Sequence, residues 1–177
     1  MKKLLVVFIF LCGFYSQSQE KKNVPLKNTQ KGFFAVDYLS VDMPTTDLGF
    51  NEIHMGLMGI HYNLAFDKFY TGLGMYGSVR GIRGGFFTLG VNAGFKNYLT
   101  DKVFIDTGIH FGGGGGAGAP DGGGAFILPH VNLGIQFKNF SFTTGYSYIN
   151  FFDKGAIENQ QLRLGLHIPT TFASANT

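Results

Sequence analysis

Apolar residues recur at every second position through most of the chain after Gly32, and clusters of turn residues separate these alternating runs. An alternation with period two indicates β-strands, because successive side chains of a strand point to opposite faces of the sheet. The pattern predicts eight strands, at residues 33–43, 51–64, 69–79, 86–98, 103–112, 125–137, 140–150 and 160–172. The expected fold class is therefore all-β.

The predicted strands are joined by connections that alternate between short and long. AFDK, LTDK and KN are the short turns, whereas PTTDLGF, RGIRGG, a glycine run and FFDKGAIE are the longer loops. Each strand also reaches the roughly 9 to 11 residues that a tilted strand needs to cross a bilayer. Short turns at one rim and longer loops at the other are typical of outer-membrane barrels. We therefore expect an eight-stranded antiparallel up-and-down transmembrane β-barrel.

Side-chain parity predicts how neighbouring strands are aligned. In residues 86–98 the apolar side chains share one face, while Asn92 and Lys96 lie on the other. A tight turn after this strand places Lys96 opposite Asp106 and Asn92 opposite His110, so that polar side chains meet on the inner face. Pairing across the next short connection, Lys138-Asn139, places polar residues together in the same way, including His130 opposite Ser147.

The first predicted strand, residues 33–43, is less regular than the others. Asp37 is expected to face the interior, but Leu39 and Val41 follow it on the same face. Since apolar residues should face lipid, this parity predicts a bulge in the strand or its exit from the membrane.

The inner polar side chains are the set in which a site would be sought. They are Asp37, His61, Asn63, Asn92, Lys96, Asp106, His110, His130, Arg163 and His167. Four of the chain's five histidines belong to this set, which hints at a metal or proton site. No HExxH motif or close histidine pair supports it, and small barrels need inner polar networks to satisfy buried groups. We interpret the set as a structural network, with a ligand site as the alternative, and expect no metal or cofactor.

Glycines alternate with larger residues on the same inner face, as in strands 69–79 and 86–98. An eight-stranded barrel has an interior just wide enough for side chains to fill. Small inner residues therefore leave space for large ones such as Tyr70, Tyr76 and Arg163. The interior is expected to be packed, without an open pore.

The N-terminal residues MKKLLVVFIFLCGFYSQSQ have the charged, apolar and polar regions of a secretory signal peptide. We expect residues 1–19 to be this signal and residues 20–31 to be a polar periplasmic segment. Cleavage removes Cys12, the chain's one cysteine, and with it any disulfide or thiolate site. It also leaves 14 − 2 = 12 basic against 11 acidic side chains, a net charge of +1 that argues against a nucleic-acid partner.

Over residues 32–172 the sequence resembles the small eight-stranded outer-membrane barrels of Gram-negative bacteria, the OmpA and OmpX type. Residues 163–170, RLGLHIPT, approximate the spacing by which the barrel assembly machinery recognises terminal strands, and residues 173–177 follow as a tail. The Phe-rich composition resembles that of Bacteroidota outer-membrane proteins. The resemblance implies an outer-membrane location with periplasmic termini. It also implies contact with outer-membrane lipids and lipopolysaccharide, insertion by the assembly machinery, and membership of a larger outer-membrane complex as one option.

The glycine run FGGGGGAGAPDGGGAF, residues 111–126, supplies neither the Lys nor the hydroxyl of a phosphate-binding loop. Gly72-x-Gly74-x-x-Gly77 matches a dinucleotide fingerprint by letter but lies within a predicted strand. We expect the run to be a surface loop, marked by Gly112, Gly116, Pro120, Asp121 and Gly124. Either it caps the barrel mouth, or it is an adhesive or partner-docking loop.

The favoured function is a non-enzymatic structural barrel, or a small subunit of an envelope assembly that presents surface loops. The alternative is a lipid A-modifying enzyme, an acyl hydrolase or transferase, for which a Ser–His pair is required. His130 with Ser147 is the cross-strand candidate. Both should face the interior, out of reach of an acyl chain in the bilayer.

Overall fold

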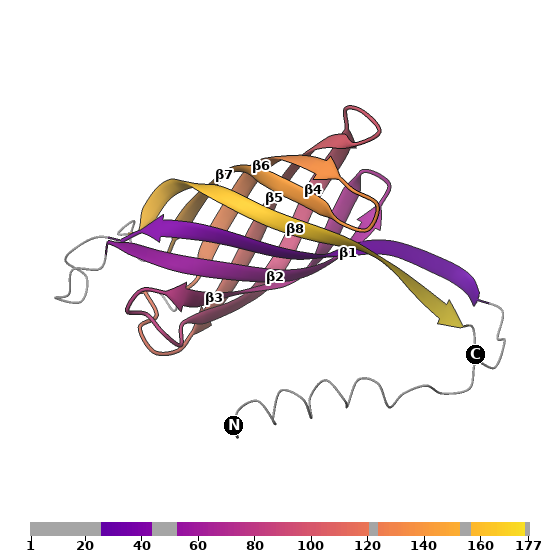
Figure 1. Ribbon diagram of the computed structural model, residues 1–177. Coiled ribbons are helices and arrows are strands. Elements are labelled where there is room, and N and C mark those ends of the chain that lie inside the picture. Colours follow the sequence, from indigo (N-terminus) through magenta and orange to yellow (C-terminus); the bar gives the residue numbers. More distant parts are fainter. Residues whose placement is uncertain (1–25, 44–52, 121–123, 153–156, 176–177) are drawn as a thin grey trace, which may run out of the picture. The chain divides into compact units, whose positions relative to one another are not determined.

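The computed structural model describes residues 26–43, 53–120, 124–152 and 157–175, and these form eight strands joined in one closed antiparallel barrel (Figure 1). The strands are β1 (Leu26–Asp42), β2 (His54–Phe66), β3 (Phe69–Arg80), β4 (Phe87–Tyr98), β5 (Val103–Gly115), β6 (Phe126–Gln136), β7 (Ser141–Phe151) and β8 (Glu158–Ala175). The expected fold class, an all-β up-and-down barrel of eight strands, is confirmed. The expected signal peptide lies outside the described residues.

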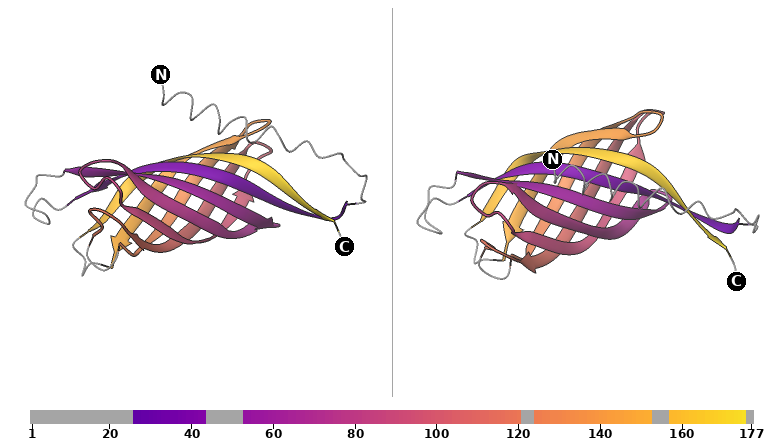
Figure 2. Two further views of the ribbon diagram at one scale, coloured as in Figure 1. Left: turned by 90° about the horizontal axis from the view of Figure 1, so that it is seen from below. Right: turned by 60° about the horizontal axis from the view of Figure 1, so that its bottom comes forward.

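The barrel is the compact unit Thr29–Phe172. The other unit of the chain contributes residues 26–28 of β1 and 173–175 of β8. β1 therefore begins within the segment 20–31 that was expected to precede the barrel. In each view β8 lies beside β1, where the barrel closes (Figure 2).

Each strand is hydrogen-bonded to the next strand in the chain, and a short turn or a longer loop connects the two. The short turns share one end of the barrel (Figure 1). We call this the turn end and the opposite rim the loop end. The Leu99 amide donates to the Val103 carbonyl at 2.8 Å, and the Phe137 amide donates to the Phe140 carbonyl at 2.7 Å, which fixes two of these turns.

The expected alignment of β4 with β5 and of β6 with β7 is confirmed. Asn92 pairs with His110, and Lys96 with Asp106. Across the other hairpin, His130 pairs with Ser147. Because a shift of one residue would turn every inner side chain outward, these pairs determine which side chains occupy the interior.

The bulge expected in β1 does not occur in its ladder with β2, and the other expectation, an exit of this strand from the membrane, stays a prediction. The β1–β2 ladder is continuous from Gly32 to Asp42, and the irregularity lies instead on β2, between Gly56 and Leu57 against β3. Leu39 and Val41 stay on the inner face and are fully buried. The reason is that the interior changes character along the barrel axis, from polar near the middle to apolar at the loop end.

A cluster of apolar side chains fills the interior at the loop end, and we call it the loop-end cluster. Its residues are Leu39, Val41, Met43, Met55, Leu57, Tyr76, Phe86, Phe126, Leu128, Ile149, Phe151 and Ile157. Phe86 and Ile157 come from connections between strands rather than from the strands themselves. The loops therefore help to close the barrel mouth with apolar contacts that exclude water.

Part of the glycine run is strand, which corrects the expectation of a loop beginning at Gly112. β5 continues to Gly115, and residues 112–115 pair with β4, with Gly112 buried. At Gly114 the neighbouring backbone requires glycine, because a Cβ there would lie 2.0 Å from the Phe87 carbonyl oxygen. The connection to β6 begins only at Gly116.

The described part of this connection packs onto the barrel mouth. Arg83 Nη1 donates to the Gly118 carbonyl at 2.8 Å, and Pro120 and Gly124 are buried. Gly124 has φ 63°, and a Cβ there would lie 2.4 Å from the Phe86 ring. Glycine is therefore needed both for this backbone conformation and for the close approach. These contacts favour the cap over a free adhesive loop; Asp121 lies outside the described residues.

Candidate functional site in the barrel interior

Asp37 is the hub of the inner polar network. Its carboxylate accepts hydrogen bonds from the Tyr76 hydroxyl at 2.7 Å and from Arg163 Nε at 3.0 Å, and it lies 2.6 Å from His61 Nε2. The four residues come from β1, β3, β8 and β2, and all are buried. A carboxylate withdrawn from water is stable here because a guanidinium and two further donors replace its hydration.

A second buried carboxylate, Asp106, lies on β5. The Tyr70 hydroxyl donates to Asp106 Oδ1 at 2.9 Å, and His130 Nε2 lies 3.8 Å from Asp106 Oδ2. Tyr70 and His130 also approach each other, with 3.4 Å between the hydroxyl and Nε2. Asp106 is thus held by weaker contacts than Asp37, and mainly by a neutral donor.

Asn92 links the histidines of neighbouring strands. Its side-chain Nδ2 lies 3.2 Å from His61 Nδ1 and donates to Asn63 Oδ1 at 3.2 Å, while its Oδ1 lies 2.6 Å from His110 Nδ1. Because an amide NH2 only donates, His61 Nδ1 must accept, and its Nε2 then carries the proton toward Asp37. One asparagine therefore sets the tautomers of two imidazoles.

The expected side-by-side placement of Lys96 and Asp106 does not produce an ion pair. Although the two residues are register partners, the Lys96 ammonium lies 3.9 Å from the centroid of the Phe104 ring, with the Phe33 and Tyr98 rings at 5.3 and 5.8 Å. Within the described part of the chain, no carboxylate lies within ion-pairing distance of it. The flexible stem carries the ammonium away from the centre, where it is held by cation–π contacts.

The centre of the network encloses a cavity of about 20 Å³, lined by side chains that include His61, His110, His130 and Arg163. This volume is sufficient for one water-sized molecule. His110 Nε2, His130 Nδ1 and Arg163 Nη1 have no hydrogen-bond partner among the described residues. The described residues contain no group of three or more His, Cys, Asp or Glu arranged to hold a metal ion.

His130 and Ser147, the candidate catalytic pair, are both enclosed in the barrel. The side chain of His130 is 7% exposed and Ser147 is 3% exposed. Ser147 Oγ accepts from Gln161 Nε2 at 3.2 Å, whereas His130 Nε2 faces Tyr70 and Asp106. Neither side chain is placed to activate the other as a nucleophile toward an external acyl chain.

The two tyrosines that donate to the carboxylates were expected inside the barrel, but their role as donors was not. Each ring lies over glycine on a neighbouring strand: a Cβ on Gly94 would lie 2.2 Å from the Tyr70 ring, and one on Gly59 would lie 2.5 Å from the Tyr76 ring. An inward tyrosine beside an inward glycine on the adjacent strand is the sequence signal that could have indicated these positions.

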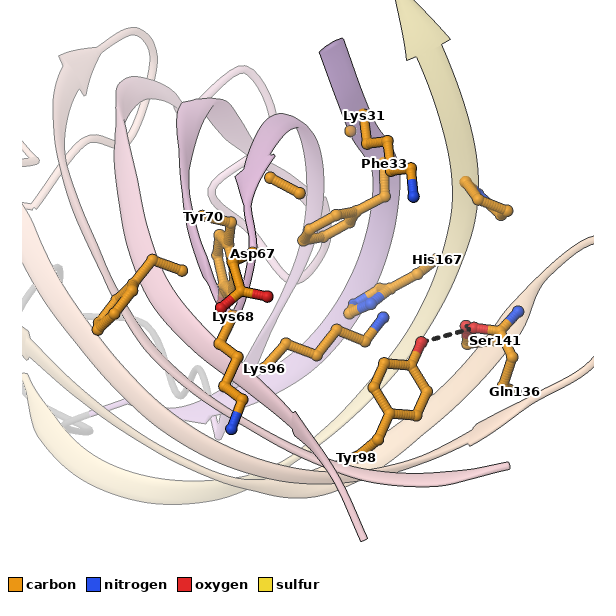
Figure 3. A pocket seen from close by; sticks show the side chains of 14 residues that line it. Lys31, Phe33, Asp67, Lys68, Tyr70, Lys96, Tyr98, Gln136, Ser141 and His167 are labelled. Carbon is orange, nitrogen blue, oxygen red and sulfur yellow. Dashed lines mark hydrogen bonds between the residues drawn. The ribbon is translucent and has the colours of Figure 1, made fainter. Parts of the chain in front are cut away.

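The turn end of the barrel contains a pocket of about 290 Å³, which we call the turn-end pocket (Figure 3). Its lining residues are Lys31, Gly32, Phe33, Ala65, Asp67, Lys68, Phe69, Tyr70, Lys96, Tyr98, Gln136, Ser141, His167 and Pro169. The Tyr98 and Ser141 hydroxyls both donate to Gln136 Oε1, at 3.2 and 2.7 Å. Lys96 and His167 thus belong to this pocket, although the sequence indicated only that they face inward.

The outer surface of the barrel is apolar over most of the strands. Large apolar side chains are exposed on every strand from β2 to β8, including Leu73 at 70%, Leu89 at 62% and Leu162 at 60%. The inward neighbours of these three leucines in sequence are polar or glycine, so the alternation around them is the reverse of that in a water-soluble barrel. No described segment forms a helix long and apolar enough to span a bilayer.

No protein-family model matches this sequence, and a search of curated proteins finds no match either. Among solved structures, the chain is similar to the outer membrane protein Ail of Yersinia pestis, with 13% identity and a TM-score of 0.45 over 78% of this chain and 99% of that one. It is also similar to Neisserial surface protein A, with 9% identity and a TM-score of 0.47 over 79% of this chain and 96% of that one. The expected Bacteroidota origin gains no support from these similarities.

Proposed function

We propose that this protein is an integral β-barrel of a Gram-negative outer membrane, and that it acts as a structural element or as a small subunit of an envelope assembly. The observation that carries the proposal is the outer apolar surface. A patch larger than a few hundred Å² is rare on monomeric soluble proteins, whereas here exposed Leu, Ile, Val and Phe follow seven strands around the barrel. Hydrocarbon is the solvent that suits such a surface.

The proposed orientation places the turn end and both termini in the periplasm and the longer loops outside. Bacterial barrels of this class have short periplasmic turns and longer outer loops, and this chain has the same asymmetry. Outer-membrane lipids and lipopolysaccharide are then the immediate surroundings of the barrel, and the barrel assembly machinery is the partner that inserts it. A larger outer-membrane complex would engage the barrel through its loops.

A non-enzymatic role is supported by the placement of the chemistry-bearing side chains. His61, His110, His130 and Ser147 are all turned inward, and the loop-end cluster separates them from the barrel mouth at the loop end. Their polar contacts are with other side chains of the interior: His61 with Asp37, His110 with Asn92, and Ser147 with Gln161. Such an arrangement stabilises the interior and offers no nucleophile to lipid A.

The test is electrophoretic mobility together with cell fractionation. A closed strand ladder has no edge at which detergent can begin to unzip it, so an unheated sample should migrate faster than a boiled one. The protein should be recovered with the outer membrane. Identical mobility of the two samples, or recovery in the soluble periplasm, would contradict the proposal.

The choice between structural element and subunit requires a second measurement. Co-purification in mild detergent should retain a partner at fixed stoichiometry if the loops dock to an assembly. Mass spectrometry of lipid A from cells with and without the protein tests the enzymatic alternative, because a changed acyl count would contradict a non-enzymatic role.

A further inference from the structure

We propose that the turn-end pocket binds a small organic carboxylate with an apolar body, held by its charge against Lys96. The inference concerns the barrel interior and goes beyond the proposed outer-membrane role. It rests on the charge inside the pocket, the nature of its walls and an unpartnered polar atom on one of its lining side chains.

The first observation is a cation without an ionic partner. Lys96 extends into the pocket between Phe33, Tyr98 and His167 (Figure 3), and no described carboxylate lies within 4.0 Å of its ammonium. Cation–π contacts with Phe104, Phe33 and Tyr98 hold the group in place but do not neutralise it. An anion entering the pocket would therefore gain a charge-assisted hydrogen bond that the barrel itself does not provide.

The second observation is an unpartnered imidazole nitrogen. His167 is 5% exposed, and its Nδ1 has no hydrogen-bond partner among the described residues. Its ring is stacked on Phe33, with 4.9 Å between centroids and 25° between planes, and Figure 3 shows it beside Lys96. A buried polar atom without a partner is costly, and a ligand oxygen bound at Lys96 would lie within the same pocket.

The side chains at the walls and mouth of the pocket indicate the size and polarity of the part of the ligand beyond its carboxylate. Phe33, Tyr70 and Tyr98 form aromatic walls, and Gln136 and Ser141 add a polar strip. Lys31 and Lys68 line the mouth with Asp67, the one acidic side chain among the described residues that line the pocket. A volume of about 290 Å³ is at the lower end for small-molecule sites. The pocket therefore fits a compact molecule with one anionic group and an apolar body better than a polyanion.

A free phosphate is the weaker fit for the same pocket. Phosphate sites commonly use an arginine fork, or several backbone amides at a helix N-terminus, to satisfy the oxygens together. Lys96 is a single point charge surrounded by rings. One oxygen pair directed at Lys96, with the remainder of the ligand against Phe33 and Tyr98, satisfies this geometry.

The experiment uses the full mature barrel in lipid nanodiscs and N-acetyl-phenylalanine as the probe, followed by saturation-transfer NMR. The neutral amide of the same compound tests whether binding requires the negative charge. Inorganic phosphate, an anion without an apolar body, tests whether binding requires the apolar part. We expect saturable binding of the acid, with a dissociation constant at least tenfold lower than that of the amide or of phosphate. Empty nanodiscs provide the background from partition into lipid.

The variant Lys96→Met should raise the dissociation constant of the acid at least tenfold. Lys102→Met is the matched control, since Lys102 is an exposed turn lysine outside the pocket, and it should leave binding unchanged. Equal binding of acid and amide, equal binding of phosphate, or no saturable binding would each overturn the inference. The comparison of ligands uses the unaltered protein, so it stands even if Lys96→Met fails to fold. If the gel mobility of the barrel changes on boiling but the barrel binds none of the probes, the ligand-binding inference is refuted and the outer-membrane proposal stands.

Discussion

At the scale of single residues, the interior is organised by pairing large side chains with glycine and carboxylates with several donors. Asp37 receives a guanidinium and a tyrosine hydroxyl and faces an imidazole, so its charge is matched within the barrel. Asp106 has no such cation in contact and relies on Tyr70 and His130. Loss of a neighbouring side chain should therefore lower the free energy of unfolding by different amounts at the two carboxylates.

The first prediction concerns the Asp37–Arg163 pair. Arg163→Met leaves a buried carboxylate without its cation, and breaking such a pair lowers the free energy of unfolding by about 3–5 kcal/mol. Adding Asp37→Asn should recover most of the loss, because the amide oxygen can still accept from Tyr76. Urea unfolding in detergent, followed by the gel shift of the folded band, measures this. Arg80→Met, at an exposed position, is the control and should have almost no effect. A double variant no more stable than Arg163→Met would refute the pairing argument.

At the scale of elements, neighbouring strands fit together through complementary inner faces. On β5 and β6 the Phe104 ring lies over Gly134, and a Cβ on that glycine would lie 2.1 Å from the ring. Tyr70 on β3 occupies the space left by Gly94 on β4 and Gly108 on β5. Glycine on one strand thus determines which neighbour can carry a large inner residue, and this limits the register in addition to polarity.

The second prediction tests this fit between β5 and β6. Gly134→Ala should reduce the free energy of unfolding by about 1–3 kcal/mol, the usual cost of overpacking an interior, because the Phe104 ring cannot stay in place. Combining it with Phe104→Leu should restore part of the loss. Gly77→Ala is the matched control, since a Cβ there would meet one atom, the Phe86 carbonyl oxygen, at 4.0 Å. Equal effects of the two glycine changes, read from urea unfolding, would show that inner packing is loose.

At the scale of the whole molecule, the interior consists of three layers along the barrel axis. The loop-end cluster closes one mouth, the network around Asp37 and Asp106 occupies the centre, and the turn-end pocket opens at the other rim. The cavity within the central layer has a volume of about 20 Å³, enough for one water-sized molecule. The barrel is therefore accessible from one end and closed at the other.

The third prediction follows from this closed mouth. The purified barrel in a planar bilayer should give no stepwise ion conductance, because an ion would have to cross dry apolar side chains such as Leu39, Phe126 and Leu128. A larger open porin reconstituted in the same way provides the positive control. Stable conductance steps from this protein would contradict the layered interior.

The sequence by itself determined the number of strands, their approximate bounds and the inner or outer face of most side chains. The period-two pattern and the alternating connection lengths predicted the barrel, and parity across two short turns gave pairs such as Asn92 with His110 and His130 with Ser147. These features are local or span one hairpin, so the chain order already contains them. The inner position of Asp37, Asp106 and four histidines followed from the same parity.

Only the tertiary structure decided what the inner side chains contact. Arg163 and Asp37 lie 126 residues apart and meet only because β8 closes against β1. Leu39 and Val41 face inward because apolar partners from distant strands and loops gather at the loop end, which alternation within β1 could not reveal. The Lys96 side chain turns away from its register partner because its reach and the nearby Phe104 ring, rather than its position in the strand, determine where the charge lies.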